Sequence, residues 1–229
     1  MIAIALLLSF FLATDQPTVS GPLTMAASTQ KKILVVRIGG HDVKKYDVAV
    51  GLKNHPTPMG RFTVRHIVWN PAWVPPDKPW AKGKSPTPPG HPKNPMKVVK
   101  IFFQEPDYYI HGTDNEESIG EAASHGCLRM RVTDAYDLAR YLMTHAGAPH
   151  DDAWFDQVIG LGKPADVHLP QGVSFVIGKQ DAPSSPRHPP LSSPRRTKGN
   201  STSRPRRLRT CPRCARRAFP PGCKCPARW

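Results

Sequence analysis

Short apolar runs, several of them rich in β-branched side chains, recur along the first half of the chain and predict strands. Ile33 to Ile38 is one such run, and Val43 to Val50 alternates between apolar and polar residues as a hairpin partner would. Gly39 and Gly40 supply the turn between them. Phe62 to Trp69 predicts a further strand.

Strand-like runs return at Lys97 to Phe103 and Tyr108 to His111, on either side of a turn at Glu105 to Asp107. A short helical turn is expected around Ala153 to Ile159, and a final strand near Val173 to Ile177.

One clear helix is predicted after the strands. Thr133 is a suitable N-cap, and Asp134 and Asp137 are assigned to the first turn, where acidic groups are favourable. Gly147 and Pro149 end the helix. Apolar side chains at helical spacing form its buried face: Leu138, Tyr141 and Leu142.

Asn70 to Pro95 is rich in proline and has no periodic apolar pattern, so it is predicted to be a loop. A loop of this length inside a compact domain is usually functional or disordered. Trp69, Trp73 and Trp80 lie beside or within it. Two interpretations stay open: the tryptophans face a substrate as part of a lid, or they fasten the loop to the domain.

Most of the predicted elements are strands, which indicates an α+β fold that is predominantly β and argues against a doubly wound sheet. The folded domain is expected to span residues 31–178, with a core at 33–145 and a short extension at 146–178. The flanking segments 1–30 and 179–229 differ in composition and are expected to lie outside it.

Ile2 to Leu12 is an almost unbroken apolar run of 11 residues. It is too short to span a bilayer as a helix, and it has the length of the apolar region of a secretory signal peptide. Ala13, or Ala26 with Ala27, would provide small residues for cleavage. Export to the cell envelope, periplasmic or extracytoplasmic, is therefore expected; the alternative is a translation start at Met25.

The charge of the chain is concentrated at one end. The 229 residues include 32 Lys and Arg against 17 Asp and Glu, a formal charge of +15. Pro183 to Trp229 holds 13 of the basic residues and no acidic one, so residues 1–182 are close to neutral. This segment also has too few apolar residues for a core, and a disordered basic tail is predicted. The charge therefore does not indicate specific nucleic-acid binding by the domain.

The tail contains the cysteine pairs Cys211/Cys214 and Cys223/Cys225, separated by eight residues. Four thiolates could bind zinc, but the spacing is tighter than in common zinc ribbons, and an exported protein would more often form disulfides. The segment could also be the product of a frame change. Electrostatic attachment to anionic wall or membrane polymers ranks above zinc binding.

Cys127 is the single cysteine of the folded region, within Ser124-His125-Gly126-Cys127. A thiol nucleophile needs a base or a cationic neighbour, because the free group is mostly protonated at neutral pH. His125 would share the face of Cys127 on an extended backbone, and His111 ends the preceding strand, sixteen residues earlier. Gly126 permits a tight backbone, and the amides of Gly126 and Cys127 could form an oxyanion hole.

From these residues alone, non-catalytic interpretations remain open. A lone cysteine is more often an inert small hydrophobe than a nucleophile. His111, His125 and Cys127 are also three possible metal ligands, and Arg129 could be an ordinary surface charge.

The stretch from His111-Gly-Thr to Ser124-His-Gly-Cys-Leu-Arg-Met130 resembles the signature of the L,D-transpeptidase catalytic domain, the YkuD family of bacterial cell-wall enzymes. The resemblance covers about Ile33 to Met143. Further segments follow in the family's order: Tyr46 to Gly51, Thr57 to Thr63, Asn70 to Pro76 and Pro88 to Met96. It implies a β-sandwich-like catalytic fold with one clear helix after the cysteine.

The resemblance also implies roles for single residues. Cys127 would attack the bond before the terminal D-alanine of a peptidoglycan stem tetrapeptide, and His111 would act as base and acid. The carbonyl of Gly112 would orient the imidazole, His125 would shape the site, and Arg129 would engage a substrate carboxylate. Three further residues are expected to contact substrate: Ser124, Asn94 and Trp73.

Two departures from the family pattern concern its periphery. Relatives usually have a glycine soon after the Asn-Pro of the long loop, whereas Asn94-Pro95-Met96 is followed by Lys97 and Val98. The first hairpin, Ile33 to Val50, is shorter than usual. These differences bear on acceptor preference and on the lid.

The resulting expectation is an exported L,D-transpeptidase that transfers the stem acyl group from a Cys127 thioester to an amine, without cofactor or metal, and that carbapenems could inhibit. L,D-carboxypeptidase activity, with water as acceptor, is the nearest alternative. An alternative of another class is a polyanion-binding protein that acts through its tail.

Overall fold

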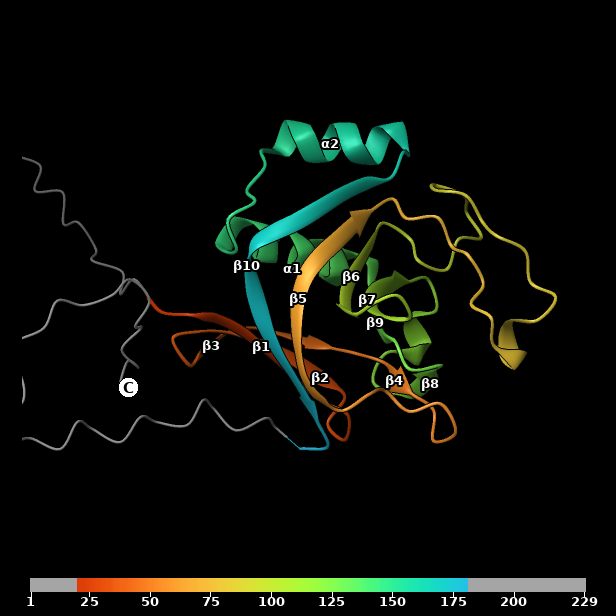
Figure 1. Ribbon diagram of the computed structural model, residues 1–229, viewed down its shortest axis with the longest axis horizontal. Coiled ribbons are helices and arrows are strands. Elements are labelled where there is room, and N and C mark those ends of the chain that lie inside the picture. The colour runs from red at the N-terminus through yellow and green to blue at the C-terminus, as the bar shows by residue number, and fades with distance from the viewer. Residues whose placement is uncertain (1–19, 181–229) are drawn as a thin grey trace, which may run out of the picture. The chain divides into compact units, whose positions relative to one another are not determined.

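The computed structural model describes residues 20–180, and these form a sheet with two helices (Figure 1). The strands are β1 (Leu23–Ser28), β2 (Ile33–Ile38), β3 (His41–Asp47), β4 (Val50–Gly51), β5 (Gly60–Trp69), β6 (Val99–Gln104), β7 (Tyr108–Thr113), β8 (Ala122–Ser124), β9 (Leu128–Arg131) and β10 (Ala165–Gly178). The helices are α1 (Val132–His145) and α2 (Asp152–Leu161), with 3₁₀ turns η1 (Pro79–Ala81) and η2 (Glu116–Ser118).

Eight strands form one sheet in the order β3-β2-β1-β10-β5-β6-β7-β9, and β4 pairs with β8 separately. Neighbours in the large sheet are antiparallel except β1 with β10 and β7 with β9. The fold is thus predominantly β with helices in addition, as the sequence predicts.

The core lies between the sheet and α1, which packs against β6, β7 and β9. Ile110 and Leu128 point into it from the strands, and Leu138 and Leu142 from the helix; all four are fully buried. Since side chains alternate across a strand, His111 and Arg129 project from the opposite face. Helix α1 therefore covers one face of the sheet at this edge, and His111 and Arg129 lie on the other face.

The second helix covers the end of β5. Trp69 is fully buried, and its ring lies edge-on to Tyr136, Trp154 and Phe155 at centroid distances of 5.4, 6.3 and 5.2 Å. Asp151 caps α2 by accepting a hydrogen bond from the amide of Trp154. The helical turn expected at 153–159 is thus a ten-residue helix.

The predicted boundary at residue 31 is wrong, because β1 lies inside the sheet between β2 and β10. Met25 and Ala27 of this strand are 1% exposed. Cleavage after Ala26 or Ala27 would cut through the strand, so the structure argues against that site as a processing point.

The second strand of the predicted hairpin, Val43 to Val50, is divided in the structure. β3 ends at Asp47, and Ala49 then exchanges hydrogen bonds with Arg129 of β9, at 2.9 and 3.0 Å. The chain from 48 to 51 therefore leaves the hairpin and supports the edge of the sheet that carries the candidate site.

The N-cap prediction for α1 is also wrong. The helix begins at Val132, directly after β9, and Arg131 occupies the cap position without a side-chain hydrogen bond. Asp134 is in the first turn, but Asp137 is not; its carboxylate accepts hydrogen bonds from Lys44 and from the hydroxyl of Tyr46. This contact ties α1 to β3.

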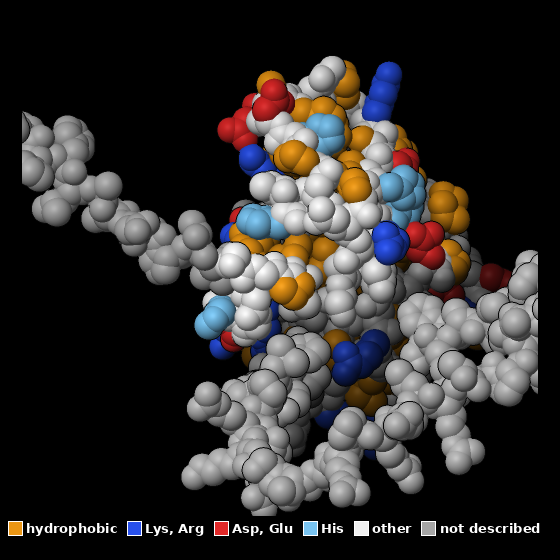
Figure 2. Space-filling view, turned by 60° about the vertical axis from the view of Figure 1, so that its left-hand side comes forward, with side chains coloured by type: hydrophobic (Ala, Val, Ile, Leu, Met, Phe, Trp, Pro, Cys, Tyr) orange, Lys and Arg blue, Asp and Glu red, His pale blue; other side chains and the backbone are white. Residues whose placement is uncertain are grey.

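Figure 2 shows basic, acidic and hydrophobic side chains intermixed on the visible part of the described surface, which fits the near balance of charge in residues 1–182. No helix in residues 20–180 is long and apolar enough to cross a membrane. Two sets of predictions concern residues outside the described range. One is the apolar leader at 2–12, and the other is the tail, predicted to be disordered and considered as zinc-binding, disulfide-bonded or attached to anionic polymers.

Candidate active site

Two neighbouring strands, β7 and β9, bring His111 and Arg129 together at one edge of the sheet. β7 and β9 are parallel, with His111 opposite Arg129 and Ile110 opposite Leu128. Since register partners in adjacent strands share a face, the imidazole and the guanidinium project to the same side. Cys127 immediately precedes β9, so it lies at the start of that strand, in the same pocket as His111 and Arg129.

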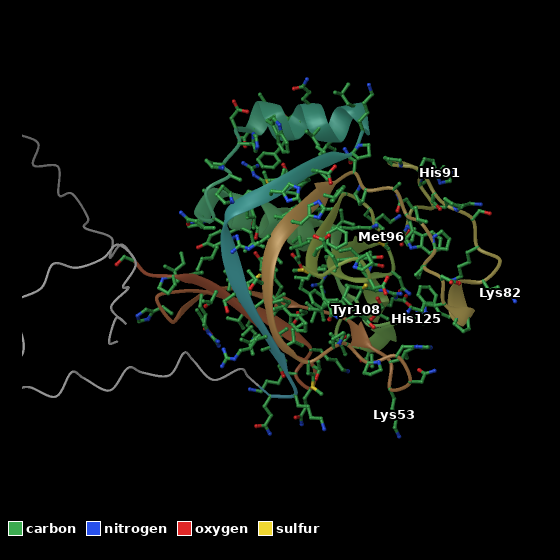
Figure 3. All side chains as sticks on the ribbon, in the orientation of Figure 1. Lys53, Lys82, His91, Met96, Tyr108 and His125 are labelled. Atoms are coloured by element: carbon green, nitrogen blue, oxygen red, sulfur yellow. The ribbon has the colours of Figure 1, made fainter. Side chains whose placement is uncertain are left out.

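These side chains line a pocket of about 510 Å³ between the sheet edge and the 70–98 loop. In Figure 3, Met96 and His125 lie on either side of the region where the loop meets the sheet, with Lys82 farther out along the loop. The residues that shape its walls include Trp73, Trp80, Met96, Lys100, Tyr109, His111, His125, Cys127 and Arg129.

Ser124 holds the turn that presents Cys127. Its hydroxyl donates to the carbonyl of Cys127 at 2.6 Å and accepts from the amide of Gly126 at 3.1 Å, and the residue is 1% exposed. Ser124 nevertheless lines the pocket, so its contact with substrate stays a prediction. The Gly126 amide donates to the Ser124 hydroxyl and is not free to act as an oxyanion donor in this conformation, while the role predicted for the Cys127 amide stays a prediction.

Gly126 is nevertheless required by the backbone. Its φ is +114°, and a Cβ atom there would lie 2.6 Å from a ring carbon of Tyr108. An L side chain is strained at this φ and collides with the ring as well. The small residue in the motif thus sets the path of the chain beside the sulfur.

Cys127 is partly exposed, and its thiol donates to the carbonyl of Asp107 at 3.5 Å. Burial raises the pKa of the thiol to about 11, against the opposing effects of hydrogen bonds from Tyr109 and of the Arg129 and Lys100 charges. The resting group is therefore a neutral thiol at neutral pH.

His111 is 4% exposed, and its Nδ1 donates to the carbonyl of Gly112 at 2.8 Å. A carbonyl can only accept, so the neutral ring carries its proton on Nδ1 and its basic lone pair on Nε2. Desolvation lowers the pKa of His111 to about 4, and the charges of Arg129 and Lys100 act in the same direction. The carbonyls of Gly112 and Pro95 both favour the protonated ring and so act to raise the pKa of His111. The Gly112 contact that the family resemblance implies is thus present.

No hydrogen bond joins His111 to Cys127 in the part of the chain that the structure describes. The two groups share the pocket, but the sulfur faces the Asp107 carbonyl. Catalytic hydrogen bonds are often loose in a free enzyme and shorten on binding of substrate.

His125 lies in an aromatic stack. Its ring packs on the indole of Trp80 at 4.0 Å, nearly parallel, and its other neighbour is His55 at 4.9 Å. Desolvation, followed by the nearby cationic groups, lowers the pKa of His125. His125 therefore joins η1 of the 70–98 loop to the turn that carries Cys127.

The three tryptophans in or beside the 70–98 loop have different surroundings. Trp69 belongs to the core, whereas Trp73 and Trp80 line the pocket. Trp73 is held in place by two backbone hydrogen bonds with Thr87, at 2.8 and 2.9 Å.

Asn94 does not line the pocket, and its predicted contact with substrate is not supported. It is 1% exposed, and its amide donates to the carbonyls of Pro71 and Pro88 at 2.8 and 3.1 Å. Its Oδ1 accepts from the amide of Met96 at 2.9 Å. Asn94 is a brace that closes the loop on itself.

Arg129 is partly buried, and it forms no ion pair with a carboxylate among residues 20–180. Desolvation lowers the pKa of its guanidinium, and the Cys127 thiolate would raise it. An unpaired, half-desolvated guanidinium at the pocket is suited to bind a carboxylate.

Lys100 and Tyr109 are pocket residues that the sequence analysis missed. Lys100 interrupts an apolar run, Val98-Val99-Lys100-Ile101-Phe102-Phe103, and Tyr109 stands two residues before His111 on the same strand face. A charge within an otherwise buried strand is the signal that could have found Lys100.

No group of three or more His, Cys, Asp or Glu within residues 20–180 is arranged to hold a metal ion. His111, His125 and Cys127 do not form such a group.

A family model described as the L,D-transpeptidase catalytic domain (YkuD) matches residues 24–151. A Bacillus subtilis protein assigned as the L,D-transpeptidase YkuD is 30% identical over 118 residues, which are 52% of this chain and 59% of the relative. A second, YqjB of the same organism, is 36% identical over 98 residues, 41% of this chain and 51% of the relative. The chain thus spans little more than half the length of either.

Solved structures with a similar fold include an L,D-transpeptidase from Mycobacterium smegmatis, with 16% identity and a TM-score of 0.43, covering 68% of this chain and 58% of that one. Another is L,D-transpeptidase 3 of Mycobacterium tuberculosis with a faropenem-derived adduct, with 15% identity and a TM-score of 0.42, covering 68% and 59%. These likenesses concern the fold alone.

Proposed function

The chain belongs to the L,D-transpeptidase catalytic domain (YkuD) family, and from this membership we propose that it transfers acyl groups of peptidoglycan stem peptides with Cys127 as the nucleophile. The observation that carries the proposal is the single pocket that contains the Cys127 thiol, the His111 imidazole and the Arg129 guanidinium. It holds the nucleophile, a neutral base and a cation for a substrate carboxylate in one place.

The first half of the proposed reaction starts from two neutral groups. The raised pKa of Cys127 and the lowered pKa of His111 oppose a resting thiolate–imidazolium pair. On substrate binding, the S–H group exchanges the Asp107 carbonyl for Nε2 of His111, which removes the proton as the sulfur attacks the carbonyl carbon.

The leaving group departs with that proton. The tetrahedral intermediate collapses when the C–N bond to the terminal D-alanine breaks, and the His111 imidazolium protonates the departing nitrogen. A thioester on Cys127 remains. The Nδ1–H bond to Gly112 keeps the ring oriented and stabilises the transient cation.

The second half of the reaction reverses these roles. An acceptor amine loses its proton to His111 and attacks the thioester, the new amide bond forms, and the thiol leaves and regains its proton. Arg129 binds the carboxylate of the donor stem during the first half. Because the substrate is wall peptide, the proposed site of action is extracytoplasmic.

The direct test is incubation of the full chain with a disaccharide-tetrapeptide, with products identified by mass spectrometry. We expect release of D-alanine together with a cross-linked dimer, and neither product from Cys127→Ala. Tripeptide without a dimer would indicate L,D-carboxypeptidase activity instead. Absence of any product, or equal activity of Cys127→Ala, would refute the proposal.

A second test uses a carbapenem as a covalent probe. We expect one adduct that maps to the peptide containing Cys127 and that is absent from Cys127→Ala. An adduct confined to the cysteines of residues 211–225 would contradict the assignment of the nucleophile.

A further inference from the structure

Lys100 is the third member of a row of basic side chains across the sheet edge. In the antiparallel pair of β6 and β7, Lys100 is opposite His111, and in the parallel pair of β7 and β9, His111 is opposite Arg129. All three side chains therefore project from the same face, with the imidazole between the two cations.

The ammonium of Lys100 is held at the pocket by two contacts. Its Nζ donates to the carbonyl of Ala72 at 3.1 Å and lies 4.8 Å from the ring centroid of Tyr109. The residue is partly buried, between Val99 and Ile101, which are fully buried. Placing a charge at such a position has a desolvation cost, which a structural residue would avoid.

The acidic groups of the pocket are paired with other lysines. Asp107 lies 3.8 Å from Lys78, and Asp114 lies 2.6 Å from Lys97. Neither Lys100 nor Arg129 forms an ion pair with a carboxylate in the stretch from 20 to 180.

The remaining charged or titratable groups around the sulfur are few. Lys84 and His125 also line the pocket, and the Tyr109 side chain interacts with the sulfur in a way that favours the thiolate. Burial lowers the pKa of Lys100, and the Cys127 thiolate would raise it, so the two groups are electrostatically linked.

We propose that Lys100 is a positioning residue for the proposed acyl transfer: together with Arg129 it brackets His111, keeps the imidazole in its neutral base form, and stabilises the negative charge that develops on Cys127. The inference rests on the proposed function for its role in turnover. The coupling between Lys100 and Cys127, however, is a property of the free protein.

Removing the Lys100 charge should raise the pKa of both Cys127 and His111. Without a nearby cation, thiolate formation at Cys127 is less favourable, so the pKa of the thiol rises. Protonation of His111 becomes more favourable, so its pKa rises as well. A nearby opposite charge typically shifts a pKa by about 1 unit or more.

The test is the rate of Cys127 alkylation by iodoacetamide between pH 6 and 9 in the full chain, followed by mass spectrometry of the Cys127 peptide to exclude the tail cysteines. Lys100→Met should react about tenfold more slowly at a given pH, because the thiolate fraction falls by that factor. Lys100→Gln keeps a donor for the Ala72 carbonyl without the charge and should behave likewise. Lys100→Arg should stay within about twofold of the wild type.

Lys45→Met is the matched control, since it removes one exposed lysine from β3, at the opposite edge of the sheet. It should alkylate at the wild-type rate. Thermal unfolding of each variant shows whether the fold is retained, and Lys100→Gln serves if Lys100→Met does not fold.

In turnover of a tetrapeptide stem, Lys100→Gln should lower kcat with little effect on KM, and the acidic limb of the rate profile should move to higher pH. An unchanged alkylation profile in Lys100→Gln, or an increase in KM alone, would overturn the inference. If the alkylation shift occurs while no variant turns over muropeptide, the coupling stands and the proposed function fails.

Discussion

Replacement of Gly126 by alanine should damage both the fold and the candidate site. The backbone at this position has a φ of +114°, and the added Cβ would lie 2.6 and 3.2 Å from two ring carbons of Tyr108. That ring stacks on Phe103, which is 4% exposed, so it has little room to move.

Two terms contribute to the loss of stability. A non-glycine residue in a sparsely populated backbone region costs about 1–3 kcal/mol. Overpacking against a ring that cannot rotate away costs about 1–3 kcal/mol more. For a domain of this size, a total near 4 kcal/mol lowers Tm by about 8–15 °C.

The assay pairs thermal unfolding with stem turnover. Because Cys127 is the next residue, relief of the collision moves the sulfur, and a displacement of about 1 Å from the reactive geometry costs on the order of 100-fold in rate. Gly126→Ala should therefore lose both stability and kcat/KM.

Gly120→Ala is the matched control. Gly120 also has a positive φ, +86°, but nothing lies within 4 Å of the Cβ position. Only the backbone term applies there, about 1–2 kcal/mol, with turnover retained. Equal effects of the two substitutions would refute the role assigned to the Tyr108 contact, as would zero coupling between Gly126→Ala and Tyr108→Ala in a double-mutant cycle.

The rate of acylation should stay constant from pH 7 down to about pH 5 and fall as the pH approaches the His111 pKa of about 4. Because histidine in the unfolded chain titrates near 6.5, protonation of His111 should also lower the free energy of unfolding by up to about 3 kcal/mol as the pH falls from 6.5 to 4. Unfolding curves of His111→Asn should lack this loss. Asn94→Ala should lose about 3 kcal/mol, and limited proteolysis should cut the 70–98 loop faster; wild-type resistance in both Asn94→Ala and Asn94→Asp would contradict the bracing role. A chain that starts at residue 29 lacks β1 and should show no cooperative unfolding by circular dichroism, whereas one that starts at residue 20 should unfold like the full protein.

The missed strand β1 shows a limit of local patterns. Leu23 to Ser28 is rich in small residues and adjoins an apolar leader-like segment, so it carries no strand signal of its own. It is a strand because β2 and β10, which lie far apart in the chain, offer hydrogen-bonding edges on both of its sides. A local sequence window of about ten residues does not contain such distant partner strands, so it cannot predict this strand.

The strand predicted near Val173 to Ile177 is the second part of a longer strand, β10. Pro170 and Gly172, which are disfavoured inside strands, lie between its two parts. The structure accommodates them with a register shift between His168 and Val173, so the strand continues on both sides.

From the sequence alone, the pattern of apolar and polar residues determined a mostly β domain, and the Ser124 to Met130 motif with His111 predicted a nucleophile and a base through its resemblance to a known family. Strand patterns and motifs of this kind are carried by residue type and short spacing, which local physics governs. Only the tertiary structure decided that Ser124 and Asn94 serve the backbone and that Lys100 joins His111 and Arg129 in one row. The reason is that strand register and hydrogen-bond satisfaction depend on partners distant in the chain, and they determine whether a polar side chain faces a substrate or is used up inside the fold.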